Sequence, residues 1–333
     1  MLKFVSRRLA YTFAVLVLVS IVVFIIFNFL PIDPARLTCG KSCFPALIEA
    51  NRHRLGLDVP WWEQWWRFIH GLFAGRSYAE GSAAIVCGAP SFGYSFNQHS
   101  CVTTLIGQAF PVTFSLAVGS FILWMILGIS LGVLAARFKG RMPDRIATVF
   151  VLVGTSLPTF ISGLLILLFV VLKFNLINPI EMGQWMSPFT NPWGYFKEFI
   201  FPCITLALAY AATYTRFTRS NVIETSSEDF IRTAKAKGLS SGVILRKHTL
   251  RAALSPILTI AGLDFAGLLG GAIITEQIFN LPGLGRLSIK AVLTDYDLPV
   301  ILSTTLLAAA FVVIANLVVD IAYAFIDPRV RVA

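Results

Sequence analysis

Charge is scarce in this chain of 333 residues: 13% of them are Asp, Glu, Lys or Arg, whereas 56% are hydrophobic. Ordinary soluble domains carry about 25% charged residues. So little polar surface excludes a soluble globule and predicts a membrane protein. The net charge of +10 does not indicate nucleic-acid binding, because the basic residues lie between long apolar runs and form no solvated patch.

Signatures of catalysis and of nucleotide hydrolysis are also missing. The sequence contains no GxxxxGK[ST] phosphate loop and no HExxH, and its four histidines are scattered. No CxxC or paired-histidine spacing supports a metal site. These absences argue against an enzyme, and they predict that energy for any transport comes from another chain.

What the sequence does contain is long apolar runs. A helix needs roughly 20 apolar residues to cross a bilayer, because its backbone polar groups must be bonded within the segment. The first run follows Lys3, Arg7 and Arg8 but is too long for a cleaved signal, so we interpret it as a span. Six spans are predicted, near Leu9 to Leu30, Thr103 to Ala136, Ile146 to Leu172, Phe199 to Ala212, Leu254 to Phe279 and Leu298 to Phe325.

Lys and Arg residues indicate the orientation of these spans. We set aside residues 31–102, because long loops cross the membrane regardless of charge. The remaining loops and termini then carry 17 Lys and Arg residues on one side and 4 on the other. Cytoplasmic loops carry the positive excess, so both termini and the 216–251 loop are expected in the cytoplasm. Residues 31–102 then form an external loop.

The external loop contains the run WWEQWW and four of the five cysteines. Trp61, Trp62, Trp65 and Trp66 recur at helical spacing, which predicts a short amphipathic helix at the membrane interface; a docking face for a substrate-binding protein is the alternative. An oxidising exterior favours disulfides, and of three connectivities we expect Cys39 with Cys43 and Cys87 with Cys101. A metal site near His99 and Cys101 is the other interpretation.

The segment from Arg216 to Pro256 is the most informative. Ser226 followed by Asp229 is typical of a helix N-cap, Gly238 of a stop, and Ser240 of the next cap. The first helix is expected to place Phe230, Ile231 and Ala234 on one face, as an apolar ridge for a groove on a partner protein. Membrane topology alone does not explain two helices in a loop that needs only a few residues.

The runs DFIRTAKAKGLS and RKHTLRAAL in this segment resemble the cytoplasmic EAA loop of ABC-importer permeases, in the form found in dipeptide and oligopeptide permeases. In that family the loop is a coupling helix that docks on a separate ATPase. The resemblance places the ATPase contact and its turn at Phe230, Arg232, Thr233, Ala234, Ala236, Lys237 and Gly238. Arg232, Thr233 and Ala234 stand where other branches have Glu-Ala-Ala.

The resemblance extends over nearly the whole chain. The runs RRLAYTFAVLVLVSIVVF, LPIDPA, EQIFNLPGLGRL and NLVVDIAYAFIDPRVR are similar to family patterns, with Ile32 in place of a glycine. The external loop departs from the family, because PSFGYS follows extra residues that include Cys87. The implied fold is all-α, a six-helix bundle of the type I importer kind. It is divided into residues 1–30, the external loop 31–102, and a five-helix core 103–333 that contains the coupling loop 226–251.

Three residues are candidates for the translocation path. An ionised side chain at bilayer depth costs at least about 2.5 kcal/mol, so Asp264 needs a partner or water. It either lines a hydrated path, where it meets a positive group such as a peptide amino terminus, or bonds to a neighbouring helix. Glu276 is the second candidate, with solvation near the external surface as the alternative. Pro158 interrupts the third span, as a gating hinge or as a proline accommodated by its neighbours.

The resemblance also implies the partners of the chain. They are a second homologous permease, two ATP-binding subunits that hold ATP and Mg²⁺, an external substrate-binding protein, peptide substrate and membrane lipid, in the inner membrane of a bacterium. No cofactor is expected on this chain. Family members carry dipeptides, longer peptides, nickel chelates, glutathione or haem, so the cargo stays open. A self-sufficient secondary transporter or channel is the competing hypothesis, although no inverted repeat is evident.

Overall fold

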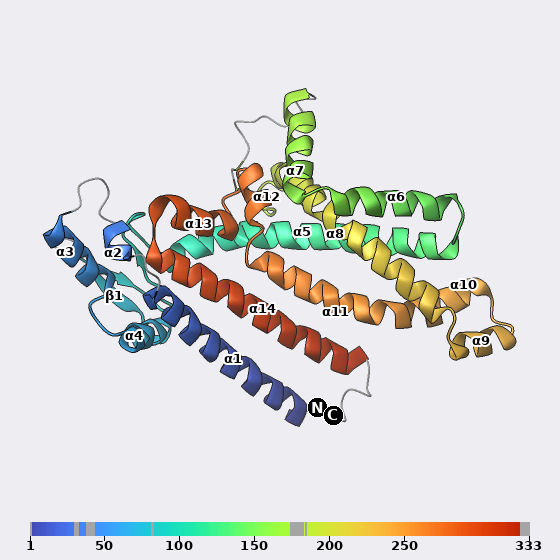
Figure 1. Ribbon diagram of the computed structural model, residues 1–333, viewed down its shortest axis with the longest axis horizontal. Coiled ribbons are helices and arrows are strands. Elements are labelled where there is room, and N and C mark those ends of the chain that lie inside the picture. The colour runs from blue at the N-terminus through green and yellow to red at the C-terminus, as the bar shows by residue number, and fades with distance from the viewer. Residues whose placement is uncertain are drawn as a thin grey trace. The chain divides into compact units, whose positions relative to one another are not determined.

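Helices make up most of the computed structural model, which describes residues 2–29, 33–37, 44–80, 83–173, 183 and 185–326 (Figure 1). The elements up to residue 101 are α1 (Leu2–Phe29), α2 (Pro34–Leu37), α3 (Pro45–Leu55), α4 (Trp61–Ala74), β1 (Arg76–Glu80), β2 (Ala83–Cys87), β3 (Tyr94–Ser95) and β4 (Ser100–Cys101). The next are α5 (Val102–Arg137), α6 (Met142–Ser156), α7 (Thr159–Leu167), the π-helical η1 (Leu168–Lys173), α8 (Pro192–Thr225) and α9 (Asp229–Ala236). The last are α10 (Ser241–Val243), the π-helical η3 (Ile244–Thr249), α11 (Leu250–Leu269), α12 (Ile273–Ile278), α13 (Leu284–Lys290), the π-helical η4 (Ala291–Asp295) and α14 (Leu298–Ile326).

The described helices agree with six spans if one bent pair is counted as a span. Five helical segments are long and apolar enough to cross a membrane, and α6 with α7 forms a sixth, bent by 99°. Large apolar side chains such as Phe13 and Leu18 on α1 are more than half exposed, as a lipid-facing surface requires. A six-span helical protein is therefore confirmed.

Two expected spans differ in detail from the structure. The fourth is longer than predicted, because α8 begins at Pro192 and continues to Thr225. The fifth begins earlier, at Ser241, and also ends earlier, because α11 stops at Leu269 and Gly271 takes a φ of +121° that a helix cannot contain. The residues up to Ile278 form the separate short helix α12.

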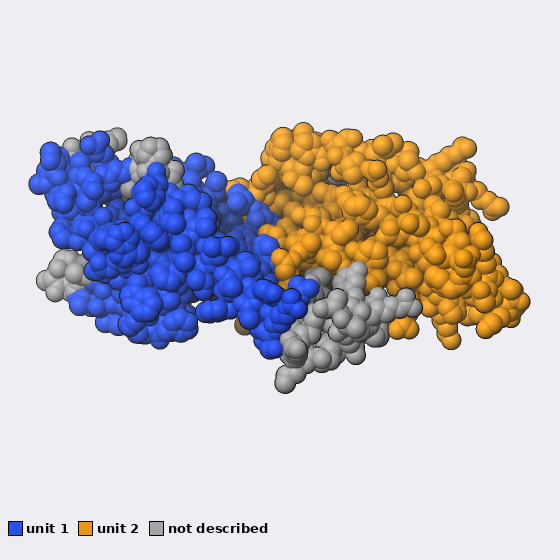
Figure 2. Space-filling view, turned by 60° about the horizontal axis from the view of Figure 1, so that its bottom comes forward, with its two compact units in different colours: residues 1–113, 269–273, 282–314 blue, residues 114–268, 274–281, 315–333 orange. Residues whose placement is uncertain are grey.

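The chain divides into two compact units (Figure 2). Unit 1 comprises residues 1–113, 269–273 and 282–314, and unit 2 comprises residues 114–268, 274–281 and 315–333. This division differs from the tail, loop and core expected from the sequence, because α5 and α14 each contribute residues to both units.

Unit 1 joins α1 to the aromatic helix α4. The Trp65 indole N–H donates to the Ser20 hydroxyl at 2.9 Å, and the Phe24 and Phe68 rings lie 5.4 Å apart. Trp62 and Trp66 remain exposed on α4, as an interfacial helix requires. Beyond α4, β1 and β2 form an antiparallel hairpin in which Arg76 lies opposite Cys87.

In the core of unit 1, the start of α5 packs against α13, η4 and the start of α14. Its buried residues are Val102, Ile106, Ala109, Leu284, Ala291 and Val300. Asp297 precedes α14, and its carboxylate accepts hydrogen bonds from the Ser95 hydroxyl and the Val300 N–H. Burial raises the pKa of Asp297 above its ordinary value, although these two hydrogen bonds lower it in part.

Unit 2 is built around close contact between α5 and α8. A Cβ atom on Gly132 would lie 2.5 Å from Thr218 Cβ and 2.7 Å from the Thr215 carbonyl oxygen. Trp124, on the same helix, is fully buried and stacks on Tyr210 with ring centroids 4.5 Å apart. Small residues permit this approach, as is usual between membrane helices.

Gly132→Ala is expected to lower the melting temperature, even though alanine favours a helix by about 1 kcal/mol over glycine. The added methyl group must displace α8, and overpacking of this kind costs about 1–3 kcal/mol. Gly267→Ala on α11 is the matched control, because its Cβ meets nothing within 4 Å. Thermal unfolding of both variants in detergent tests the packing. Equal melting temperatures would contradict it.

Candidate functional site

The segment that follows α8 contains the short helix α9, as expected. The second expected short helix is not separate, because α10 and η3 continue into α11 as one helical segment, Ser241–Leu269. The cap of α9 also differs. Ser226 does not cap α9, because its hydroxyl donates back to the Val222 carbonyl oxygen at 2.6 Å, and Glu228 is the residue that precedes the helix. The Ser226 cap is therefore wrong, and α9 starts about one turn from the end of α8.

Gly238 ends α9 as predicted. Its φ is +75°, a left-handed conformation that side-chain-bearing residues rarely adopt, and its N–H donates to the Lys235 carbonyl oxygen at 3.0 Å. A Cβ at this position would meet nothing within 4 Å. The requirement for glycine is thus set by the backbone conformation alone.

The apolar face of α9 is divided. Ile231 is 1% exposed and Ala234 is 6% exposed, and both pack with Ile244 of η3 in a small core of the chain itself. Phe230 is 47% exposed. The prediction of a continuous apolar ridge is therefore wrong: Ala234 holds α9 against η3, and Phe230 presents its ring outside this core.

Phe230 lies at a basic groove. The groove is lined by Phe230 together with Arg246, Lys247, His248, Arg251 and Ala252. The other expected contact residues, Arg232, Thr233, Ala236, Lys237 and Gly238, are exposed on α9 and its turn. Apart from Ala234, all the residues assigned to the contact thus lie at the surface of unit 2.

An ion pair fixes the base of this loop, and we did not predict it from the sequence. Arg219 on α8 donates to the Asp144 carboxylate on α6 through Nε at 2.6 Å and through a second guanidinium nitrogen at 2.9 Å. The Gly140 N–H donates to the same carboxylate at 2.8 Å. Asp144 is 6% exposed. This bidentate geometry ties the end of α8, from which α9 continues, to the start of α6.

Asp264 has a partner on a neighbouring helix. The Tyr214 hydroxyl on α8 donates to the Asp264 carboxylate on α11 at 2.7 Å. Tyr214 is fully buried, whereas Asp264 is half-buried. This hydrogen bond supports the structural interpretation of Asp264. Because the carboxylate is only half-buried, it can also make a second contact.

Glu276 and Pro158 occupy different positions from Asp264. Glu276 on α12 is fully buried, so solvation near the external surface, the alternative to a place on the translocation path, is wrong. Pro158 lies at the break between α6 and α7, because proline cannot donate the backbone bond of a continuing helix. The bend of 99° at this break is far larger than an ordinary proline kink.

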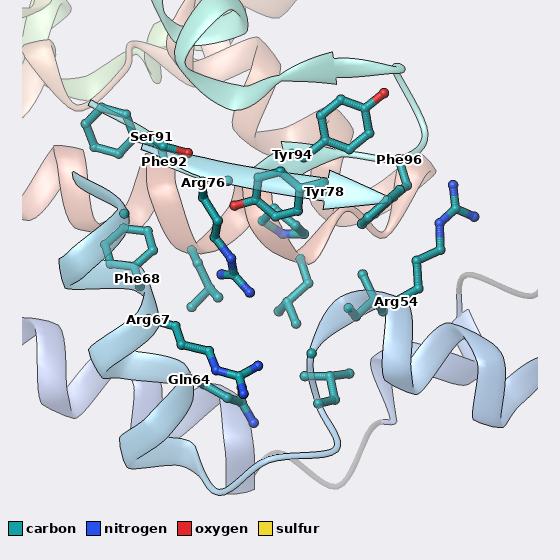
Figure 3. A pocket seen from close by; sticks show the side chains of 18 of the residues that line it. Arg54, Gln64, Arg67, Phe68, Arg76, Tyr78, Ser91, Phe92, Tyr94 and Phe96 are labelled. Carbon is teal, nitrogen blue, oxygen red and sulfur yellow. The ribbon is translucent and has the colours of Figure 1, made fainter. Parts of the chain in front are cut away.

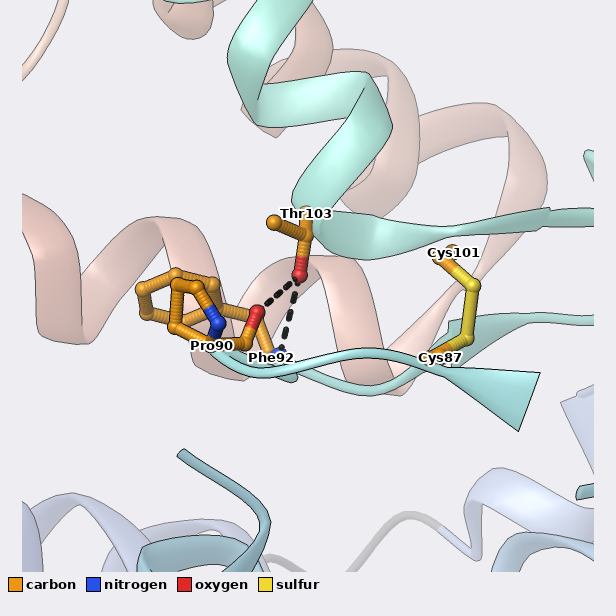
Figure 4. Close-up of a disulfide and its surroundings, with 5 residues drawn as sticks. All are labelled: Cys87, Pro90, Phe92, Cys101 and Thr103. Atoms are coloured by element: carbon orange, nitrogen blue, oxygen red, sulfur yellow. Dashed lines mark hydrogen bonds between the residues drawn. A yellow bond between two sulfur atoms is a disulfide. The ribbon is translucent and has the colours of Figure 1, made fainter. Parts of the chain in front are cut away.

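The external loop contains one of the two expected disulfides, Cys87 with Cys101, whose Cα atoms lie 5.8 Å apart (Figure 4). Cys39 and Cys43 lie outside the described residues. The Thr103 hydroxyl donates to the Pro90 carbonyl oxygen at 2.5 Å and accepts from the Phe92 N–H at 3.3 Å. The chain between the two cysteines is thereby attached to the start of α5. Among the described residues, no group of three His, Cys, Asp or Glu side chains gathers in a way that would hold a metal ion.

Six candidate spans, with the short helix α9 between the fourth and the fifth, define a transporter membrane subunit. Residues 128–332 match the family described as binding-protein-dependent transport system inner membrane component, and residues 1–117 match the N-terminal model of the same family. The chain belongs to this family and is a permease subunit of an ABC importer. A self-sufficient secondary transporter is not favoured.

Two named relatives match this chain along its full length. The glutathione transport system permease protein GsiC of Escherichia coli K12 is 36% identical over 332 residues, which is 99% of each chain. GsiC of Shigella flexneri serotype 5b has the same identity and coverage. Among solved structures, an inward-facing methionine ABC transporter MetNI chain aligns with a TM-score of 0.55 at 17% identity, over 68% of this chain and 97% of that chain. At this identity the likeness shows the fold, that of a type I importer permease.

Proposed function

We propose that this chain is one of two homologous permease subunits that surround a path for di- or oligopeptides across a bacterial inner membrane. An external substrate-binding protein delivers the cargo, and two ATP-binding subunits on the cytoplasmic side supply the energy. The relatives named for glutathione transport support a peptide cargo. The excess of Lys and Arg at both termini and in the 216–251 loop supports their cytoplasmic location.

The observation that carries the coupling role is the exposed position of Phe230 beside a basic groove. A large aromatic ring left exposed on a short helix is the type of anchor that fills a pocket on a partner protein. The basic residues of η3 line the groove beside it, and Arg232 and Lys237 are exposed on α9 and its turn, so both supply positive charge for an acidic rim. ATP and Mg²⁺ are held by the partner, and this chain needs no cofactor of its own.

The hydrogen bonds of unit 2 can transmit a movement of the ATP-binding subunits to the membrane helices. When the ATP-binding subunits close, they pull α9, which continues from α8 and packs on η3 before α11. The Arg219–Asp144 pair makes α8 and α6 move together at this end. Farther along, the Tyr214–Asp264 hydrogen bond joins α8 to α11. A change in the distance between these two helices therefore changes whether the Asp264 carboxylate can contact cargo.

Asp264→Asn separates the two roles of this carboxylate. The amide oxygen still accepts the hydrogen bond from Tyr214, so the free energy of unfolding is expected to change by less than about 1 kcal/mol. The charge that would attract a peptide amino terminus is lost, and uptake should fall by about tenfold or more. An N-acetylated peptide should lose much less. Unchanged uptake of both peptides in Asp264→Asn would leave Asp264 with a structural role only.

Reconstitution tests the whole proposal. The complete complex in liposomes, with its binding protein outside, is expected to accumulate a labelled dipeptide or tripeptide only when ATP is present inside. Omission of either the binding protein or the ATP-binding subunits should abolish uptake. Uptake by this chain alone without ATP would overturn the proposal.

A further inference from the structure

A small cavity lies in unit 1, where the segments flanking the disulfide meet α1, α4 and α14 (Figure 3). Its volume is about 80 Å³, too small for a peptide and large enough for a ligand of a few heavy atoms. Figure 3 shows Arg67 from α4 and Arg76 from β1 extending into the same space. The cavity is separate from Asp264 and from the α9 loop, which belong to unit 2.

The charged residues that line this cavity are all basic. Three guanidinium groups line it, those of Arg54, Arg67 and Arg76, and none of its described lining residues is acidic. Glu63 binds Arg67 at 2.6 Å from outside the lining. In the described part of the chain, the contact of the Arg76 guanidinium is with the Tyr78 ring, 5.1 Å away, and no carboxylate pairs with it. The Arg76 guanidinium thus presents a positive charge at the cavity, and an anion there would pair with it.

A buried hydroxyl in the same lining lacks a partner. Ser91 is 2% exposed, and no described group makes a hydrogen bond to its Oγ atom. Such an orphaned buried polar atom is uncommon and needs an explanation. A ligand oxygen in the cavity supplies one, because the hydroxyl can donate to it. The Cys87–Cys101 disulfide closes the loop that carries Ser91, which limits its movement.

The rest of the lining selects the type of anion. Phe24, Phe68, Leu298 and Leu302 contribute apolar wall, and the Arg54 guanidinium is held over the Phe96 ring at 4.1 Å. Guanidinium groups bind carboxylates in a planar, bidentate manner. We propose that the cavity binds a small carboxylate with a short apolar substituent. Arg76 binds the carboxylate, Ser91 donates to one of its oxygens, and the apolar wall receives the substituent.

Propionate is the probe that tests this site, and propionamide is its uncharged isostere. Ligand-observed saturation-transfer NMR on the full chain in nanodiscs at constant ionic strength gives the Kd of each. Saturable propionate binding is expected, with propionamide at least about tenfold weaker. Equal binding of the two, or no saturable signal from propionate, would overturn the proposal.

Arg76→Gln is expected to weaken propionate binding by about tenfold or more, and Ser91→Ala by a few-fold. Arg36→Gln is the control, because Arg36 is exposed on α2 and does not line the cavity. Arg76→Lys keeps the charge but loses the bidentate geometry, so its Kd should lie between those of the wild type and Arg76→Gln. Equal weakening in Arg36→Gln and Arg76→Gln would reduce the effect to general electrostatics and refute a defined site.

Discussion

Phe230→Asp should reduce ATP-dependent uptake by at least about 30-fold, while the protein still inserts and assembles with its homologous permease. Truncating an aromatic anchor at the centre of an interface costs about 2 kcal/mol or more, and a buried aspartate adds a desolvation cost. The fold should be little affected, because Phe230 is outside the small core of Ile231, Ala234 and Ile244. Uptake and ATP hydrolysis measured in the same liposomes give the result.

Phe230→Leu is the matched control for this prediction, since it keeps an apolar side chain at the same position and should retain most of the uptake. Ile231→Asp provides the opposite control, because a charge within the small core should lower the melting temperature itself. If Phe230→Asp transports normally, α9 does not dock through this residue.

The second large effect is expected at the base of the loop. Asp144→Asn keeps an acceptor for the Gly140 N–H but removes the charge that Arg219 faces. Breaking a buried ion pair on one side costs about 3–5 kcal/mol, and the partial exposure of Arg219 reduces this to about 2–3 kcal/mol. Thermal unfolding should show a melting temperature lower by several degrees, with a similar decrease for Arg219→Gln.

A double-mutant cycle isolates the interaction. If the two residues act through each other, Asp144→Asn and Arg219→Gln combined should cost little more than either alone. Glu63→Gln is a control on an ion pair whose partners are both more than 40% exposed, and it should cost less than about 1 kcal/mol. Additive losses from Asp144→Asn and Arg219→Gln would show that the two side chains stabilise the fold independently.

Local features of this chain were predictable from the sequence. Gly238 was identified because the left-handed turn after a helix favours glycine, and the break at Pro158 because proline lacks an N–H. An oxidising exterior favoured disulfides in the external loop, but Cys87 with Cys101 was an expectation among three connectivities. Apolar run length was sufficient to find the six spans, since the bilayer sets the length a helix needs.

Features that depend on contacts between distant segments were not predictable. The Tyr214–Asp264 bond joins residues 50 positions apart, and the Asp144–Arg219 pair joins residues 75 apart. Helical periodicity places Phe230, Ile231 and Ala234 near one face, but only the position of η3 decides which of them is buried. Ser226 fits a cap by type, yet its hydroxyl had an alternative acceptor in the preceding turn, the Val222 carbonyl oxygen.

Site-specific photocrosslinking can show whether α9 contacts an ATP-binding subunit. Benzoylphenylalanine placed at position 230 and irradiated in membranes that contain the whole transporter should form a covalent adduct with the ATP-binding subunit. Adducts only with the external binding protein, together with labelling of position 230 by an impermeant reagent from outside the cell, would contradict both the contact and the orientation.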